Sequence, residues 1–463
     1  MPVNSFENYP MSWKPDRSTL KRPFYLSIAQ ALENDITNGF LAPGTKLPPQ
    51  RELADFLDIN FTTITRSYKI CELKGLIYAV TGSGTFVSPN ATRSITISTD
   101  NFSGTCIDLG FVASFEQCNS MILETAKKVM EKRYLEQLFN YNDPTGMPHQ
   151  KMAGLNWMES FGIYADTEHL AIISGAQNAL AITLSALFEP GNRIAVDFYT
   201  YSNFIELAKM FHIQLVPIIG DENGMLPDEL ENQCRLNEIH GIFLMPSCCN
   251  PTTIMISDDR KKELAGIIKK YNLIVIEDDI HAFLTADIIV DYKQPMFQLL
   301  PKQTVYICST SKSMCSGLRV AYMVFSDMFK EKILKAIFNI NVKTSSLDGE
   351  IITDLILSGK ANEIAAKKKS IAQSANEIFT EYFPETPHIG HPLSFFKWLP
   401  ISENKNAHEL EANLLKKGIR VFHSDRFLSG SSKPDKFLRV ALASTNSLDE
   451  LKMGLEILKA QLM

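Results

Sequence analysis

The sequence predicts an α/β protein: a small helical unit closed by a β-hairpin, followed by a much longer region built on a parallel sheet. Two observations support this prediction. The first ninety residues contain three stretches with helical periodicity and then two strand-like runs around a glycine-rich turn. After residue 106, short runs of consecutive apolar residues alternate with helical stretches, a pattern typical of a sheet covered on both faces. The predicted domains are 1–88 and 107–463, joined by a linker at 89–106.

Each of the three N-terminal helices has its own start or stop signals. The first, at 23–38, begins at a proline and ends at Gly39, the second occupies 49–57, and the third follows Asn60 as N-cap and ends at Gly75. The apolar positions that define their buried faces are Phe24, Ile28, Leu32 and Ile36; Leu53, Phe56 and Leu57; and Ile64, Tyr68 and Cys71. With strands at 76–80 and 85–87, this is the plan of a winged helix-turn-helix, whose third helix enters the major groove.

Two segments of this unit resemble GntR-type regulators: 41–54 (LAPGTKLPPQRELA) and the wing at 81–87 (TGSGTFV). The resemblance implies that the chain contacts DNA through Arg51, Thr62, Thr63, Arg66, Gly82 and Gly84. Arginines pair with phosphates or a guanine edge, and threonines with phosphate or a thymine methyl. Residues 1–90 contain nine Lys/Arg against eight Asp/Glu, a net charge of +1, so the prediction depends on the motif. The alternative is a small helical cap on an enzyme.

The linker is mostly polar and lacks helical periodicity. Its central part, 94–98, alternates polar and apolar residues, so it could also form a short strand.

In the long region, apolar runs occur at 170–173, 193–196, 241–245, 273–276 and 304–307. Because these runs are continuous and do not alternate, we expect strands buried on both faces and therefore a parallel sheet. Ligands of such sheets bind beyond the carboxyl ends of the strands. Several polar motifs follow these runs directly, which predicts a ligand site at this edge.

The most informative motif is Ser309-Thr310-Ser311-Lys312, with Arg319 seven positions after the lysine. A lysine amine forms a Schiff base with an aldehyde, while Ser309, Ser311 and the planar fork of Arg319 suit a phosphate dianion. The segment resembles the lysine segment of fold-type I pyridoxal-phosphate (PLP) enzymes, the aminotransferases. The resemblance implies that Lys312 carries the cofactor as an internal aldimine.

The same resemblance implies a role for each of the other motifs. Gly175, Ala176 and Gln177 would bind the cofactor phosphate at a helix start, and Tyr201 would stack on the pyridine ring, with Phe198 or Tyr199 as alternatives if the register slips. The remaining predicted residues are Asn250 for the phenolic oxygen, Asp278 (or Asp279) for the ring nitrogen, His281 in place of the family's usual tyrosine, and Arg439 for a substrate carboxylate. Thr253 stands where the family has glycine.

A winged helix in front of these motifs resembles one group, the MocR subfamily of GntR regulators. It implies a homodimer that binds operator DNA and senses PLP or a small amine or amino acid through external aldimine formation. The alternative is an active aminotransferase with an accessory DNA-binding domain. A net charge of −6, eight scattered cysteines without metal-ligand spacing, and no signal-peptide pattern predict a cytoplasmic protein that contacts no membrane.

Overall fold

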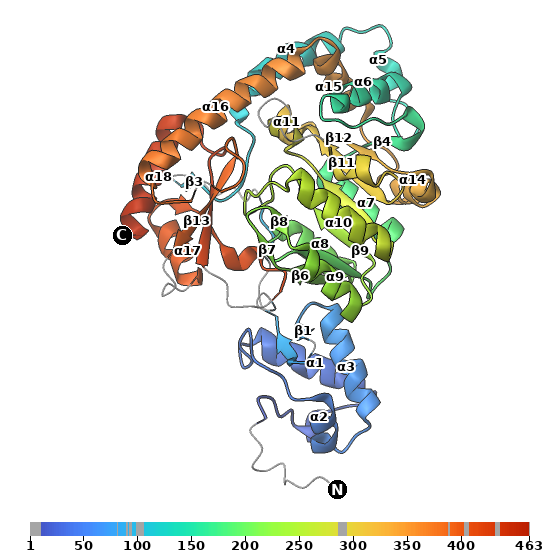
Figure 1. Ribbon diagram of the computed structural model, residues 1–463, viewed down its shortest axis with the longest axis vertical. Helices are drawn as coiled ribbons and strands as arrows, with labels where there is room; N and C mark the ends of the chain where they lie inside the picture. The colour runs from blue at the N-terminus through green and yellow to red at the C-terminus, as the bar shows by residue number, and fades with distance from the viewer. Residues whose placement is uncertain are drawn as a thin grey trace.

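The computed structural model describes residues 11–80, 82–88, 91, 95–98, 106–285, 294–387, 389–401, 407–430 and 436–462. Thr81 of the wing motif and linker residues 89, 90, 92–94 and 99–105 lie outside this range. Among the helices that the structure describes, none is long and apolar enough to cross a membrane. The winged unit lies below the rest of the chain in Figure 1.

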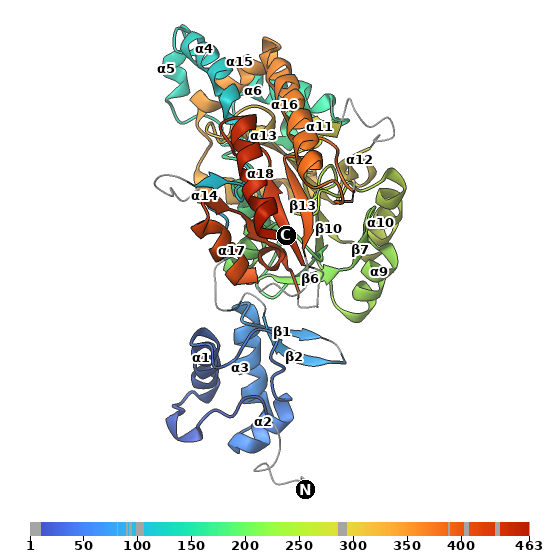
Figure 2. The ribbon, with the colours of Figure 1, turned by 90° about the vertical axis from the view of Figure 1, so that its left-hand side faces the viewer.

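The winged unit contains the three expected helices, α1 (Phe24–Thr37), α2 (Gln50–Leu57) and α3 (Phe61–Leu73). A hairpin of β1 (Ile77–Val80) and β2 (Gly84–Val87) follows and projects to one side in Figure 2. The side chain of Asn60 caps α3 by accepting a hydrogen bond from the Thr62 backbone N–H at 2.8 Å. The apolar faces that the periodicity predicted meet in one core, which includes Ile28, Leu53 and Ile64. A short 3₁₀ helix, η2 (Arg17–Thr19), precedes α1.

The long region is built on a seven-stranded sheet of order β4-β12-β11-β10-β9-β5-β6. Its strands are β4 (Leu170–Ile173), β5 (Arg193–Asp197), β6 (Gln214–Ile218), β9 (Gly241–Leu244), β10 (Ile274–Asp278), β11 (Thr304–Ser309) and β12 (Ala321–Val324). All five predicted runs are strands of this sheet. The expectation of a wholly parallel sheet is wrong at one strand, because β12 runs antiparallel to both β4 and β11. Since β12 is buried on both faces like its neighbours, its sequence pattern does not reveal its direction.

Helices cover both faces of this sheet, and a further group of helices, the helical extension, lies beyond one end of it (Figure 1). Those associated with it are α7 (Ala176–Leu187), α8 (Ser202–Met210), α9 (Pro227–Leu236), α10 (Asp258–Tyr271), α11 (Ala282–Thr285), α12 (Met296–Leu299), α13 (Thr310–Ser313) and α14 (Asp327–Asn341). The extension consists of η3 (Glu116–Asn119), α4 (Ser120–Val129), α5 (Leu135–Leu138), α6 (Pro148–Glu159), η4 (Thr167–His169) and α15 (Ser346–Leu357). A small ribbon of β7 (Gly220–Asp221) and β8 (Gly224–Met225) connects β6 to α9.

The C-terminal part forms a smaller subdomain, coloured orange to red in Figure 1. Its elements are α16 (Lys360–Tyr382), β13 (Phe396–Ile401), α17 (Ala407–Lys416), β14 (Ile419–Arg420), β15 (Phe422–His423), η5 (Ser424–Phe427), β16 (Lys436–Ala441) and α18 (Leu448–Leu462). The strand β3 (Ile107–Asp108) pairs with β14, so the chain enters the long region through this subdomain. The segment after β3 then crosses to the sheet.

The winged unit touches the long region at the C-terminal end of α3. The ring of His212, two residues beyond α8, donates from Nδ1 to the Leu73 carbonyl at 3.2 Å. The aliphatic chain of Lys209 on α8 lies so close to Gly75 that a Cβ there would stand 3.0 Å from Lys209 Cγ. Linker residues 95–98 form no strand, and Ile95 and Ile97 are buried.

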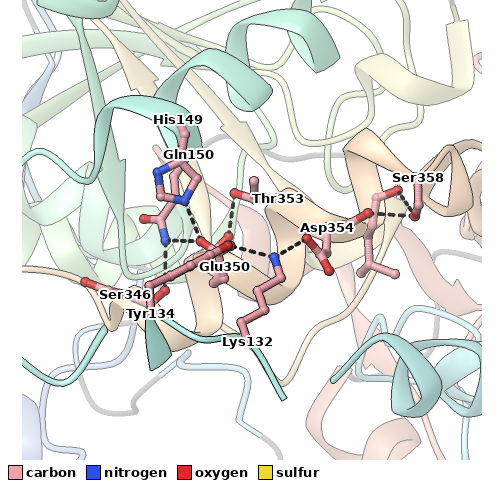
Figure 3. Close-up of polar contacts among 11 residues, drawn as sticks. Lys132, Tyr134, His149, Gln150, Ser346, Glu350, Thr353, Asp354 and Ser358 are labelled. Carbon is pink, nitrogen blue, oxygen red and sulfur yellow. Dashed lines mark hydrogen bonds and ion pairs between the residues drawn. The ribbon is translucent and has the colours of Figure 1, made fainter. Parts of the chain in front are cut away.

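A buried carboxylate joins α6 and α15 to the loop after α4 (Figure 3). Glu350, whose side chain is 1% exposed, accepts hydrogen bonds from Lys132, Tyr134, His149 and Gln150 over 2.6–2.9 Å. Burial by itself raises the pKa of Glu350, but these donors outweigh it and hold the pKa down at about 2. Within the extension, this network therefore holds α6 and the loop after α4 against α15 by an ionised side chain.

Candidate functional site

A pocket lies at the carboxyl ends of the central strands, where the sheet, the segment after β3 and the C-terminal subdomain meet. Eight of the predicted site residues line it: Ala176, Gln177, Tyr201, Asn250, Asp278, His281, Lys312 and Arg439. They come from segments that are up to 263 residues apart in the chain, and only the fold brings them together. Four other predicted residues, Gly175, Ser309, Ser311 and Arg319, form a polar cluster around Lys312 and the start of α7.

That cluster is built around the guanidinium of Arg319. Arg319 Nη1 donates to Ser311 Oγ at 3.1 Å, and Ser309 Oγ lies 3.1 Å from Ser311 Oγ. Gly175, at φ +87°, is the N-cap of α7, and a Cβ at this position would overlap the Arg319 guanidinium. A cation, two hydroxyl groups and a helix N-terminus therefore meet at one point, which is a suitable environment for a phosphate.

Lys312 lies in the short helix α13 and extends its amine into the pocket. Its Nζ donates to the backbone carbonyls of Val112 and, at 3.2 Å, Ala113, in the segment that crosses from β3. Burial, together with the positive charges of Lys368 and Arg439, lowers the pKa of Lys312 to about 7. A substantial fraction of this amine is therefore uncharged, and hence nucleophilic, at neutral pH.

Asp278 and His281 face the same pocket from the end of β10. Asp278 Oδ1 and His281 Nε2 are buried and have no hydrogen-bond partner among the described residues. Burial, together with the charge of Asp279, raises the pKa of Asp278 to about 7. Burial and the charge of Lys312 lower the pKa of His281 to about 3, so this ring stays neutral. Of the two acids considered for this role, Asp278 is the one that lines the pocket.

Three aromatic residues, Phe198, Tyr199 and Tyr201, are the candidates for stacking on the ring of a cofactor. Tyr201, the residue before α8, lines the pocket, and burial raises its pKa to about 12. Tyr199 instead packs edge-on against Phe198 and Trp398, with centroid distances of 5.1 and 5.2 Å. Of the three, Tyr201 is the one that lines the pocket.

Arg439 on β16 is the cation at the opposite wall. It is 2% exposed, and it donates from Nη1 to Asn250 Oδ1 at 2.9 Å and from Nη2 to the Gly110 carbonyl at 2.5 Å. Its guanidinium lies 4.7 Å from the centroid of the Phe427 ring. Burial lowers the pKa of Arg439 to about 9, so the group remains charged at neutral pH. Its Nε has no partner among the described residues.

The loop that carries Asn250 keeps its turn although the family's glycine is replaced. Thr253 adopts φ +67°, a region that is unfavourable for a β-branched residue. Its backbone N–H donates to the Cys249 carbonyl at 2.7 Å, and its own carbonyl accepts from the His391 N–H at 2.8 Å. These two bonds hold the strained turn in place, so the substitution does not displace Asn250 from the pocket.

The predicted DNA contacts lie on exposed parts of the winged unit. Arg51 and Thr62 are exposed, Thr63 is half-buried, and Gly82 and Gly84 are exposed at the wing. The guanidinium of Arg66, also exposed, rests 4.5 Å from the centroid of the Tyr25 ring, which fixes its direction on α3.

Several contributors to the site were not predicted from the sequence. The carbonyls of Val112 and Ala113 hold Lys312, yet backbone acceptors leave no trace in residue type. Lys368 on α16 is fully buried and donates to the Lys312 carbonyl at 3.1 Å. From the linker, Ile97 forms part of the pocket wall. The burial of Ile97 agrees with the apolar positions of the 94–98 pattern, for which a short strand was the alternative to a linker.

Comparison with known proteins agrees with both halves of the chain. The profile of the family "Bacterial regulatory proteins, gntR family" matches residues 24–87, and that of "Aminotransferase class I and II" matches residues 112–458. The uncharacterized HTH-type transcriptional regulator YdeF of Bacillus subtilis (strain 168) is 37% identical over 462 residues, which cover 99% of this chain and 98% of the relative. A second regulator of that organism, YdfD, also uncharacterized, is 24% identical and covers 96% of this chain and 97% of the relative.

Solved structures similar to the long region are aminotransferases. An archaeal alanine:glyoxylate aminotransferase superposes with a TM-score of 0.70 at 19% identity and covers 78% of this chain and 91% of that chain. A second similar structure is LysN, the α-aminoadipate aminotransferase of Thermus thermophilus, complexed with N-(5'-phosphopyridoxyl)-L-leucine. It superposes with a TM-score of 0.71 at 18% identity, and the match covers 80% of this chain and 95% of that chain. The long region therefore has the fold-type I aminotransferase fold. The chain belongs to the MocR subfamily of GntR-type transcription regulators, in which a winged helix-turn-helix precedes an aminotransferase-like domain.

Proposed function

We propose that this regulator binds PLP in the pocket and responds there to an amino compound, while its winged helix binds operator DNA. The observation that carries the proposal is the convergence of Lys312, Asp278 and Arg439 in one pocket beside the Arg319 cluster. A cofactor that combines an aldehyde, a basic ring nitrogen and a phosphate would use each of these groups. As an operator-binding regulator, the protein is proposed to act in the cytoplasm.

Unsatisfied polar atoms support the fit of this cofactor. A buried carboxylate oxygen without a hydrogen bond is costly, and Asp278 Oδ1 is such an atom. A protonated ring nitrogen opposite it would supply the missing donor and would favour the ionised form of Asp278. Gln177 Oε1 and His281 Nε2 are two further buried atoms that have no partner among the described residues, and both belong to pocket-lining side chains.

The residues divide the chemistry among themselves. When bound, PLP supplies an aldehyde that condenses with amines and a ring that withdraws electrons. Lys312 offers the amine, and Val112 and Ala113 orient it. The phosphate would lie between Arg319, Ser311 and the start of α7, while the neutral His281 would share a hydrogen bond with the phenolic oxygen. Arg439 would bind the carboxylate of an incoming amino acid and thereby orient its amine toward the cofactor.

We also propose a homodimer. Five large apolar side chains are exposed on or beside helices α4, α5 and α6: Leu123, Met130, Phe139, Tyr141 and Met152. Large exposed apolar side chains are typical of a surface covered by a partner, and a second copy is the occupant that the aminotransferase-like domain favours. Sedimentation analysis tests this point, because a Phe139→Asp variant should shift the protein toward monomer.

The absorbance of the purified protein tests the main proposal. PLP should give a visible band that shifts when amines or amino acids are added, and DNA affinity should change with the same midpoint. A band that shifts without any change in DNA affinity would favour the second candidate, an active aminotransferase. That candidate is supported by the pKa of about 7 for Lys312, which suits proton transfer. Rapid formation of a keto acid in the steady state would establish it.

A further inference from the structure

The linker between the two domains forms part of the wall of the ligand pocket. We infer that a ligand in the pocket affects the winged unit through Ile97 of the linker. Asn203 acts as a positioning residue, because its side chain holds Ile97 in place by hydrogen bonds. This inference rests on the proposed function, because it requires a ligand that binds beside Arg439.

Asn203 holds the linker by both polar groups of one residue. The Ile97 backbone N–H donates to Asn203 Oδ1 at 2.8 Å, and Asn203 Nδ2 donates to the Ile97 carbonyl at 3.1 Å. This reciprocal pair resembles the bonding of a β-strand, but a single side chain provides it. One residue further on, Arg420 Nη2 donates to the Ser98 carbonyl at 2.7 Å. The linker is therefore held in a defined place at residues 97 and 98.

The hydrogen-bonded pair of Asn203 and Ile97 contacts or adjoins predicted ligand-binding residues on both sides. On one side, Asn203 follows Tyr201 by two positions, and its carbonyl accepts from Gln177 Nε2 at 3.3 Å. On the other side, the Ile97 side chain packs in a cluster with Phe422 and Phe427, the two rings closest to the Arg439 guanidinium. Ile97 and Asn203 themselves line the pocket. An amino acid bound at Arg439 would therefore occupy a pocket whose wall includes the linker side chain.

The distance along the chain from this wall to the DNA-binding unit is short. Ala91 packs against the core of the winged unit, and the three residues 92–94 separate it from Ile95. A stretch of that length spans at most about 3.6 Å per residue, so Ile95 can lie only a short distance from the winged unit. This short connection is the proposed route by which occupancy of the pocket would affect the position of the winged unit.

The experiment uses the full-length protein and N-(5'-phosphopyridoxyl)-L-leucine, a stable compound that joins the phosphate, the ring and an amino-acid carboxylate. Wild type is compared with Asn203→Ala and Ile97→Ala, all at saturating probe so that differences in affinity for the probe do not enter. Asn339→Ala is the matched control, since this asparagine donates a comparable bond to the Lys335 carbonyl at 2.7 Å on α14. The DNA is a fragment selected by wild type from a random-sequence pool.

Two readouts decide the inference. In wild type, the probe should slow hydrogen exchange at the Ile97 amide and change DNA affinity by at least about fivefold, the lower range of ordinary allosteric coupling. In Asn203→Ala the amide should exchange rapidly with or without probe. In both pocket variants the DNA response should fall below about twofold, while Asn339→Ala should behave as wild type.

The contrary results are distinguishable. Unchanged exchange at Ile97 in probe-saturated wild type, or a full DNA response in Asn203→Ala, would overturn the role of the linker. Slowed exchange without any change in wild-type DNA affinity would support the contact of the ligand with the linker but refute the proposed effector function. A wild type that fails to bind the probe overturns both.

Discussion

Replacing Arg439 with glutamine should separate recognition of a carboxylate from recognition of the cofactor. The guanidinium is 2% exposed, and it is oriented by Asn250 Oδ1 at 2.9 Å and the Gly110 carbonyl at 2.5 Å. Its Nε has no partner among the described residues, so the fork retains donors for a ligand. Burial lowers its pKa to about 9, which still leaves it charged at neutral pH.

The expected size of the effect follows from this environment. Removing one member of a buried, hydrogen-bonded ion pair costs about 2–5 kcal/mol. Taking about 3 kcal/mol, and tenfold per 1.4 kcal/mol, the affinity for a bound carboxylate should fall about 100-fold. A ligand that lacks the carboxylate should lose less than about threefold, since no charge pair is removed.

Calorimetric titration with two matched ligands measures this difference. The first is N-(5'-phosphopyridoxyl)-L-leucine, and the second is the corresponding phosphopyridoxyl adduct of 3-methylbutylamine, which differs only by the missing carboxylate. Arg235→Gln is the control, because it removes an arginine whose side chain is 63% exposed on α9. Equal losses for both ligands in Arg439→Gln would show that the arginine supports the pocket structurally and does not bind the carboxylate.

Three further predictions concern other parts of the chain. Lys312→Ala should fold and bind DNA as wild type does but respond to no effector, and borohydride reduction of PLP-loaded wild type should leave the pyridoxyl mass on Lys312 and on no other lysine. Arg51→Ala and Arg66→Ala should each weaken DNA binding, by about 1–3 kcal/mol where the arginine reads a base, and unchanged affinity and salt dependence in both would refute the predicted docking. Glu350→Gln should lower the urea midpoint at pH 7 by removing a carboxylate whose pKa is held at about 2 against an ordinary 4.5, a contribution of roughly 3 kcal/mol. Because the folded-state pKa is depressed, this contribution is fully present above pH 4.5 and is lost as the pH falls toward 2. The stabilities of wild type and Glu350→Gln should therefore converge in acid. The control Glu363→Gln, at an exposed position, should match wild type at every pH.

Local signals explain why the winged unit could be predicted almost element by element. The cap at Asn60, the stop at Gly75 and the repeat of Ile64 and Tyr68 all act within a few residues of each other. The directions of the strands in the large sheet could not be predicted from such local signals. The antiparallel β12 is as apolar and buried as its parallel neighbours, so composition alone gives it no direction.

In the candidate site, too, residues in local motifs could be predicted, whereas contacts between distant segments could not. The residue types around Lys312, Asp278 and Arg439 could be assigned by position within family motifs, and the structure brings all three to one pocket. The contact between Arg439 and Asn250 spans 189 residues of sequence, and no periodicity predicts it. Lys368 and the carbonyl of Val112 could not be found, because one is an isolated lysine on a long helix and the other is backbone.

The helix α8 has one end at the pocket, next to Tyr201, and the other beside the end of α3, where His212 and Lys209 meet the winged unit. Any coupling carried by this contact has to be symmetrical, since two ligands of one protein alter each other's binding by the same factor. Bound DNA should then change the affinity of the pocket as much as the pocket changes the affinity for DNA. Operator DNA would in that case act as an effector of the aminotransferase-like domain. A protein molecule bound to its operator would then respond to a different range of metabolite concentrations from a free molecule.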